Sequence, residues 1–209
     1  MVSATSGAPA SFSNAGASEL PTIRTERLVL GWFDTADAPA LEKLAGAPEV
    51  ADTTLVIPHP YERAHAEQFL AYQAQAAAEG RELVFALHQQ GDGSLVGCAS
   101  LREIDVEHLQ AELGYWIGVP YWNQGFATEA ARAVVQVGFD QVGLNRIYAH
   151  HMARNRASGR VLERIGMRCE GILRQRVRKW GRFEDVVLYA ILRQDWSGPA
   201  TVPDSSDVA

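Results

Sequence analysis

The stretch from Glu112 to Ala131 constrains the fold of this 209-residue chain most strongly, because a strand gives way to a helix there across a short turn. Residues 112–119 are typical of a strand, and residues 127–139 place their apolar side chains on one stripe of a helix. Backbone N–H groups at a helix start lack partners within the helix and carry about half a positive charge. Gly125, just before this helix, leaves room for a diphosphate to approach those groups, although an ordinary strand–helix connection stays an alternative.

The periodicity of the remaining chain predicts an α+β protein with a mixed sheet. Asp34 is expected to cap a first helix, which Gly46 and Pro48 then end. The segment Gln90–Gly93 has the composition of a hairpin turn. Strands are expected over residues 22–33, 82–88, 95–104, 146–151, 167–178 and 182–193, and the other helices over 35–45, 61–78 and 157–164.

The two ends of the chain differ in composition from the middle. Residues 1–20 and 197–209 are rich in small and polar side chains, so we expect two flexible tails around one domain spanning residues 21–196. The N-terminal segment lacks the basic and apolar regions of a signal peptide. No apolar run approaches the roughly 18 residues that a membrane span needs. We therefore expect a cytoplasmic protein without a membrane partner.

The formal net charge of −6 is unevenly distributed, because residues 146–193 hold 12 basic and 4 acidic side chains. Such a basic third in an acidic chain indicates a polyanionic ligand. His150 and His151 lack companion ligands at metal spacing, so no metal is expected. Cys98 and Cys169 are expected to be reduced and buried, with a disulfide as the alternative.

The residues from Trp122 to Ala130 read Trp-Asn-Gln-Gly-Phe-Ala-Thr-Glu-Ala. They resemble the acyl-CoA-binding motif of the GNAT N-acetyltransferases, in the branch that includes the ribosomal-protein N-terminal acetyltransferases RimJ and RimL. Three further stretches agree with this branch in order and spacing: Arg24–Leu30, Asn155–Met167 and Gly171–Tyr189. The resemblance covers about residues 21–196. It implies the GNAT acyl-CoA N-acyltransferase fold, a mixed and mostly antiparallel sheet of six to seven strands flanked by helices and splayed at the CoA site.

The resemblance also implies acetyl-CoA as the acyl donor. In the family, backbone N–H groups of the turn hold the pyrophosphate of CoA, and pantetheine lies beside the splayed strand. The residues that match this CoA site are Ile117, Val119, Gln124, Gly125, Phe126, Ala127, Thr128, Asn155 and Ser158. Trp122 departs from the Arg or Gln often found at its position, which matters little because the backbone does the binding. A helix cap and a surface hydroxyl stay as alternatives for Asn155 and Ser158.

Direct transfer of an acetyl group to a primary amine is the reaction that the resemblance implies. The amine must be neutral to attack, and an α-amino group has a reference pKa of about 7.7–8.0, so a single carboxylate would suffice as base. Glu112 resembles the strand carboxylate that many members use as general base, while a structural or substrate-positioning role stays open. The thiolate is often protonated by a tyrosine whose position here is Leu162. Ser158 or water is left for that task.

The sequence leaves the acceptor open. The namesakes of the branch acetylate protein N-terminal α-amines, and other members acetylate small amines such as antibiotics and polyamines. A non-catalytic acyl-CoA-binding module is the alternative outside enzymes. One CoA polyanion accounts for part of the basic third, so a nucleic acid is not expected, although the arginines after Gly171 could also grip an acidic peptide or RNA. Relatives are often dimers, which by analogy makes a homodimer an option.

Overall fold

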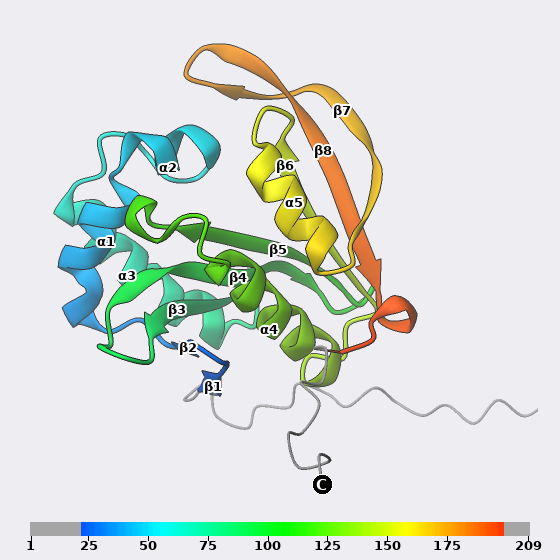
Figure 1. Cartoon of the computed structure of the whole chain (residues 1–209), viewed down its shortest axis with the longest axis horizontal. Coiled ribbons are helices and arrows are strands. Elements are labelled where there is room, and N and C mark those ends of the chain that lie inside the picture. The colour runs from blue at the N-terminus through cyan, green and yellow to red at the C-terminus, as the bar shows by residue number, and fades with distance from the viewer. Residues whose placement is uncertain (1–21, 199–209) are drawn as a thin grey trace, which may run out of the picture.

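The computed structural model describes residues 22–198, which form an eight-stranded sheet with helices on both faces (Figure 1). The predicted tails, 1–20 and 197–209, lie almost wholly outside the described residues. The strands, in the spatial order β1-β2-β3-β4-β5-β6-β8-β7, are β1 (Ile23–Arg24), β2 (Leu28–Gly31), β3 (Leu83–Gln89), β4 (Leu95–Asp105), β5 (Gln110–Ile117), β6 (Arg146–Met152), β7 (Arg168–Lys179) and β8 (Arg182–Leu192). The α-helices are α1 (Ala38–Ala45), α2 (Pro48–Thr53), α3 (Arg63–Ala78), α4 (Phe126–Asp140) and α5 (Arg156–Arg164).

The predicted fold class is confirmed, with two local differences. The sheet has eight strands rather than six to seven because the expected first strand turns back on itself, where the Thr25 N–H donates to the Leu28 carbonyl over 2.9 Å. Helix α2 was missed because Gly46 and Pro48 were read only as a stop. Proline also suits the first turn of a helix, where its missing N–H has no partner to lose. The predicted cap is present: the Asp34 carboxylate accepts from the backbone of Ala36.

A single parallel pair interrupts the otherwise antiparallel order of the sheet. Strands β5 and β6 pair from Gln110 with Arg146 to Glu112 with Tyr148, and no further. Beyond Glu112 the two strands diverge, so the carboxyl-terminal half of β5 has a sheet neighbour only on the β4 side. This divergence is the splay that the resemblance implied.

The two faces of β5 pack against different helices, because successive side chains of a strand point to opposite sides. Leu113 and Ile117 belong to the core formed with α4, whereas Trp116 packs against the clusters that hold α1, α2 and α3. Odd-numbered residues of β5 therefore face α4, and even-numbered residues, Glu112 among them, face the opposite layer. The divergence of β5 and β6 connects the two sides.

Strands β7 and β8 continue past the end of β6 as a two-stranded arm (Figure 1). Its turn lies at Trp180–Gly181, as the sequence predicted, and the Trp180 ring lies 6.0 Å from the ring of His59. Near the base of the arm, Arg154 pairs with Asp52 of α2 and with Glu184 of β8. The arm and the α2 segment thus join above the gap between β5 and β6.

Candidate functional site

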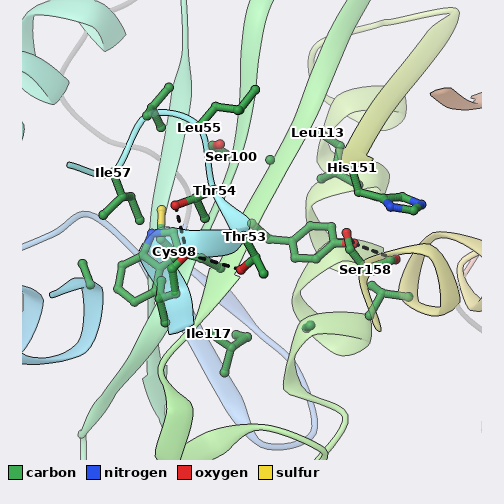
Figure 2. Close-up of a pocket in the computed structure, with 18 of the residues that line it drawn as sticks. Thr53, Thr54, Leu55, Ile57, Cys98, Ser100, Leu113, Ile117, His151 and Ser158 are labelled. Atoms are coloured by element: carbon green, nitrogen blue, oxygen red, sulfur yellow. Dashed lines mark hydrogen bonds between the residues drawn. The ribbon is translucent and has the colours of Figure 1, made fainter. Parts of the chain in front are cut away.

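A cavity of about 1110 Å³ runs through the gap between β5 and β6. Figure 2 shows Thr53 at the end of α2 and Thr54, Leu55 and Ile57 of the following loop on one side of it, and Ser158 on the other. Among its lining residues are most of the predicted site residues: Glu112, Ile117, Gly125, Phe126, Ala127, Thr128, Asn155 and Ser158. Gln124 lies between the lining residues Asn123 and Gly125, and Val119 lies two residues from Ile117 and from Tyr121, but neither lines the cavity itself. The fold therefore gathers into one cavity residues that are up to 46 positions apart, from Glu112 to Ser158.

The turn before α4 has the backbone shape of an anion site. Gly125 is the cap of the helix with φ +85°, and Asn123 also has a positive φ of 60°. The first helical bond runs from the Glu129 N–H to the Gly125 carbonyl over 3.1 Å. The N–H groups from Phe126 to Thr128 consequently have no acceptor within the helix. They point toward the end of the cavity, where a diphosphate would meet both the free donors and the positive end of the helix dipole.

A brace from the N-terminal hairpin holds this turn, and the sequence reasoning missed it. Glu129 accepts from the Thr25 hydroxyl over 2.6 Å and from the Arg27 backbone over 2.8 Å, and it forms an ion pair with the Arg27 guanidinium over 2.6 Å. The same guanidinium donates to the Gln124 carbonyl over 2.7 Å and lies over the Phe126 ring. An acidic residue in the first turn of α4 was the only sequence signal for this contact. The brace fixes where the turn presents its N–H groups.

We expect the Glu129→Gln variant to be less stable than the wild type at pH 7, with a difference that vanishes in acid. Burial raises the pKa of Glu129, but hydrogen bonds from Thr25 and Arg27 and the charge of Arg27 bring it below the ordinary 4.5. A carboxyl with a lowered folded-state pKa stabilises the fold above its ordinary pKa, and this contribution is lost as the pH falls through the folded value. Urea unfolding of both proteins from pH 7 down to about pH 2, below the lowered pKa of Glu129, measures the gap. A gap that stays constant over this range would contradict the ionic role.

The backbone of β5 offers donors to the gap. The Gly118 N–H donates to the Val96 carbonyl of β4 over 2.9 Å. Because backbone N–H groups alternate in direction along a strand, that of Ile117 points away from β4 and toward the gap, whereas Val119 already begins a short 3-10 helix, Val119–Tyr121. The Trp122 indole donates to the Ile117 carbonyl over 2.6 Å and so ties the turn to the end of β5. Trp122, which differs from the Arg or Gln often found at this position, therefore connects the turn to β5.

Ser158 has a partner that the sequence did not reveal. Its hydroxyl lies 2.8 Å from that of Tyr115, and the Tyr115 hydroxyl also donates to the Ser158 carbonyl over 3.1 Å. Burial raises the pKa of the Tyr115 phenol well above its ordinary value. Leu162 is fully buried in the core, which agrees with its lack of any hydroxyl role. The sequence analysis assigned no role to Tyr115, because a tyrosine on the inner face of a strand has the pattern of an ordinary core residue.

Asn155 caps α5, since its carboxamide oxygen accepts from the Ser158 N–H over 3.2 Å. The alternative reading of Asn155 as a cap is therefore observed. It is compatible with the ligand role because the residue also lines the cavity and the cap occupies only its oxygen. The capped helix positions the hydroxyl of Ser158 within reach of the gap.

Glu112 is the centre of a buried charged group on the other side of the sheet. It is only 5% exposed, and its oxygens pair with the Arg102 guanidinium over 3.0 Å and with His150 Nδ1 over 2.9 Å. Burial raises the pKa of Glu112, but the hydrogen bond from His150 and the charge of Arg102 outweigh this effect and leave it lowered. Arg102 and His150, both missed by sequence reasoning, line the cavity with it. We call these three residues the Glu112 cluster.

Some basic residues of the segment 146–193 form ion pairs within the fold, and others line the cavity. Arg154 is engaged in its two ion pairs, whereas Arg160 and Arg164 of α5 line the cavity, as Ala127 and Thr128 of the α4 start do. On β7 the register with β8 shifts between Leu173 and Val177, and Gln175 has φ 50°, so Arg174, Arg176 and Arg178 do not follow one regular strand alternation. Only part of the basic residues can therefore meet an anion in the cavity.

The remaining predictions have mixed outcomes. Both cysteines are free thiols; Cys98 is buried as expected, but Cys169 is exposed because β7 is the edge strand of the sheet.

Between residues 22 and 198 no three His, Cys, Asp or Glu side chains gather as a metal site requires. Over the same residues no helix combines the length and the apolar character needed to cross a membrane.

Comparison with known proteins identifies a matching family model and several similar sequences and structures. A family model described as "Acetyltransferase (GNAT) domain" matches residues 27–168, more than half of the chain. An N-acetyltransferase called p20 from Bacillus licheniformis is 29% identical over 86% of this chain and its own entire length. The [ribosomal protein uS5]-alanine N-acetyltransferase of Escherichia coli is 28% identical over 57% of this chain and 62% of its own. A GNAT acetyltransferase structure from Bacillus anthracis superimposes with a TM-score of 0.74 at 28% identity, covering 83% of this chain and 99% of that one.

Proposed function

This chain belongs to the GNAT acetyltransferase family and is an acetyl-CoA-dependent N-acetyltransferase, and from that premise we propose that its acceptor is the N-terminal α-amine of a peptide or protein. The observation that carries the proposal is the chemistry of the acceptor half of the cavity. Its wall is mainly apolar and aromatic: Leu55, Val56, Ile57, Tyr61, Phe69, Tyr72 and Trp116. Such a wall suits one amine attached to an apolar first residue.

A polyamine is the less suitable acceptor. The cavity contains two carboxylates, Glu82 and Glu112, against three arginines, Arg102, Arg160 and Arg164. The charge of Glu112 is already compensated by Arg102 and His150. An acceptor with several positive charges would find only Glu82 as a carboxylate of this cavity without an ion pair to another described residue. The Escherichia coli relative, which by its name acetylates an alanine of a ribosomal protein, supports the same acceptor class.

For acetyl-CoA we propose a binding mode that runs from the α4 turn into the gap. The N–H groups of Gln124, Gly125, Phe126 and Ala127, with the Thr128 hydroxyl, hold the pyrophosphate. Those of Ile117 and Val119 bind pantetheine as an additional strand, opposite Asn155. Support comes from the free N–H groups at the helix start, the divergence of β5 from β6, and the positions of Ile117, Gly125, Phe126, Ala127, Thr128 and Asn155 around one cavity.

The chemistry that we propose is a direct transfer. The neutral amine attacks the thioester carbonyl, a C–N bond forms and the C–S bond breaks. The amine nitrogen loses one proton on the side of the Glu112 cluster, and the departing thiolate gains one on the side of Ser158. The Ser158 hydroxyl, supported by Tyr115 at 2.8 Å, is the proton donor that replaces the tyrosine missing at Leu162. The Glu112 cluster then releases its proton to solvent, and Ser158 regains one from solvent. The products are one amide and the free thiol of CoA.

We expect Tyr115→Phe to lower the turnover number by about 10- to 100-fold, within the range of acid–base contributions, because Ser158 loses the group that replenishes its proton. The dissociation constant of acetyl-CoA should change little. Steady-state kinetics and calorimetric titration measure the two effects separately. Tyr189→Phe is the matched control: it removes another mostly buried phenol, bonded to Glu163 and not to the cavity. Equal losses in both variants would assign the effect to stability instead.

The test of the function is CoA release from acetyl-CoA with three kinds of amine: peptides with an apolar first residue, spermidine and an aminoglycoside. Peptide turnover that is lost on prior N-terminal acetylation supports the proposal. Turnover confined to spermidine or the aminoglycoside would identify a small-molecule enzyme. Acetyl-CoA binding without turnover of any amine would favour a non-catalytic binding module. The homodimer and the cytoplasmic location remain part of the proposal by analogy with relatives, to be tested by light scattering and cell fractionation.

A further inference from the structure

We propose that His150 removes the proton from the acceptor amine and that Glu112 is a positioning residue that orients its imidazole. This inference rests on the proposed function and deepens it, because it moves the base from the strand carboxylate to the histidine beside it. The two residues belong to different strands, Glu112 to β5 and His150 to β6.

The surroundings of Glu112 argue against a direct role as the base. Both of its oxygens already have partners, Arg102 at 3.0 Å and His150 at 2.9 Å, and the side chain is nearly inaccessible. Two donors on one carboxylate stabilise its ionised form, consistent with its lowered pKa. Protonation of the carboxylate would remove the negative charge that Arg102 and His150 contact and would weaken both interactions in a buried setting, which is costly.

His150 has the opposite properties. Its side chain is 30% exposed and lines the cavity, and Glu112 engages only Nδ1. A carboxylate at Nδ1 keeps the neutral imidazole protonated there, so the lone pair is at Nε2. Within residues 22–198 the contacts of this ring leave Nε2 without a protein partner. The structure therefore offers one free proton acceptor next to the gap.

The position of His150 fits the geometry of the reaction. It comes two residues after Tyr148, the partner of Glu112 in the last parallel pair, so it lies where β5 and β6 begin to diverge. Its side chain is also on the same face of the sheet as Glu112. Tyr148 is paired with Glu112, and His150 lies two residues further along β6, where the side chain returns to the same face. Tyr115 and Ser158 are on the opposite, α4 side. Proton removal and proton donation are thus separated by the gap through which pantetheine would pass.

The charges around His150 come from three strands. Glu112 of β5 contacts it, Arg102 of β4 contacts Glu112, and Tyr148 of β6 is hydrogen-bonded to Glu103. On β8 its partner is the uncharged Leu188. When Nε2 takes the proton, Glu112 stabilises the imidazolium, and Arg102 keeps that carboxylate ionised. The imidazolium then returns its proton to solvent through the open side of the cavity.

The kinetic test uses His150→Gln, with His88→Gln as its matched control. His88 makes the same kind of pair, to Asp37 at 2.9 Å, but does not line the cavity. We expect His150→Gln to lower kcat/KM for a peptide acceptor by about 100-fold, at an unchanged dissociation constant of acetyl-CoA, and His88→Gln to leave both unchanged. In acid, log kcat/KM of the wild type should rise with a slope near two, since the amine and His150 must both lose a proton. The slope should be near one in His150→Gln, and an unchanged slope would overturn the proposal.

A second measurement does not depend on the acceptor. Nitrogen-15 NMR spectra of the imidazoles, with His150 assigned by its loss in His150→Gln, report which ring nitrogen carries the proton. We expect the neutral ring of His150 to be protonated at Nδ1 in the wild type and to become a mixture of tautomers in Glu112→Ala. A neutral ring protonated at Nε2 in the wild type would overturn the proposal even if no amine in the panel is turned over. Turnover failure alone, with the Nδ1 form observed, would count against the proposed acceptor and not against this arrangement.

Discussion

Replacing Gly125 with alanine is expected to weaken acetyl-CoA binding by about 100-fold. The glycine has φ +85°, and an added Cβ would lie 3.3 Å from the Arg27 guanidinium that holds the turn through the Gln124 carbonyl, so the N–H groups offered to a diphosphate would shift. A hydrogen bond to a charged group contributes about 1.5–3 kcal/mol, so disturbing one or two of these contacts gives a loss of this size. Calorimetric titration of the variant with acetyl-CoA, and separately with CoA, measures it.

Gly143→Ala is the matched control for this substitution. Gly143 also has a positive φ, of 79°, and follows the far end of α4, with nothing within 4 Å of the added carbon. Both variants should lose about 1–2 kcal/mol of stability for the left-handed backbone, because alanine pays a steric penalty there. Only Gly125→Ala should lose affinity. If both variants bind acetyl-CoA as the wild type does, the turn is an ordinary strand–helix connection.

The Glu112→Ala variant is expected to lose between about 100- and 1000-fold in kcat/KM, the second large effect. The substitution removes the group that orients His150, and it also leaves the positive Arg102 beside an imidazole that must become cationic. Arg102 itself loses its partner in a partly buried site, so the free energy of unfolding should fall by roughly 1–3 kcal/mol. Kinetics with a peptide acceptor and urea unfolding measure the two effects.

Glu103→Ala provides the comparison on the neighbouring strand. Glu103 is an exposed carboxylate that accepts from Tyr148 over 2.8 Å and does not line the cavity. Its removal should leave kcat/KM within about twofold, as expected for a surface residue. Activity of Glu112→Ala close to that of Glu103→Ala would mean that the Glu112 cluster has only a structural role.

Several parts of the site were predictable because they depend on local backbone chemistry. Gly125 was identified from its place between a strand and a helix, where an N–H group is free whatever the side chains around it. Ser158 and Asn155 were identified from the resemblance, and both line the cavity. The boundaries of most elements followed from apolar periodicity, and the exceptions, β1 with β2 and α2, occur where a turn or a proline has two readings.

The contacts within the site were not predictable from the sequence. Arg27 and Glu129 are about a hundred residues apart, and nothing in their local sequences couples them. The pairs Tyr115–Ser158 and Glu112–His150 also join different elements. A tyrosine on a strand or a histidine beside another histidine has no distinctive pattern, so Tyr115 was given no role and His150 was considered only as a metal ligand and rejected.

By itself, the sequence determined the family and the order of most elements, and it predicted the turn at Gly125 as an anion site, because these depend on residue type and spacing along the chain. The tertiary structure decided which side chains act together. The parallel pairing of β5 and β6 ends at Glu112, and this places His150 beside the carboxylate on one face and leaves Tyr115 with Ser158 on the other. The physical reason is that proton transfer depends on distances of about 3 Å, which are set by the register of strands and not by their sequences.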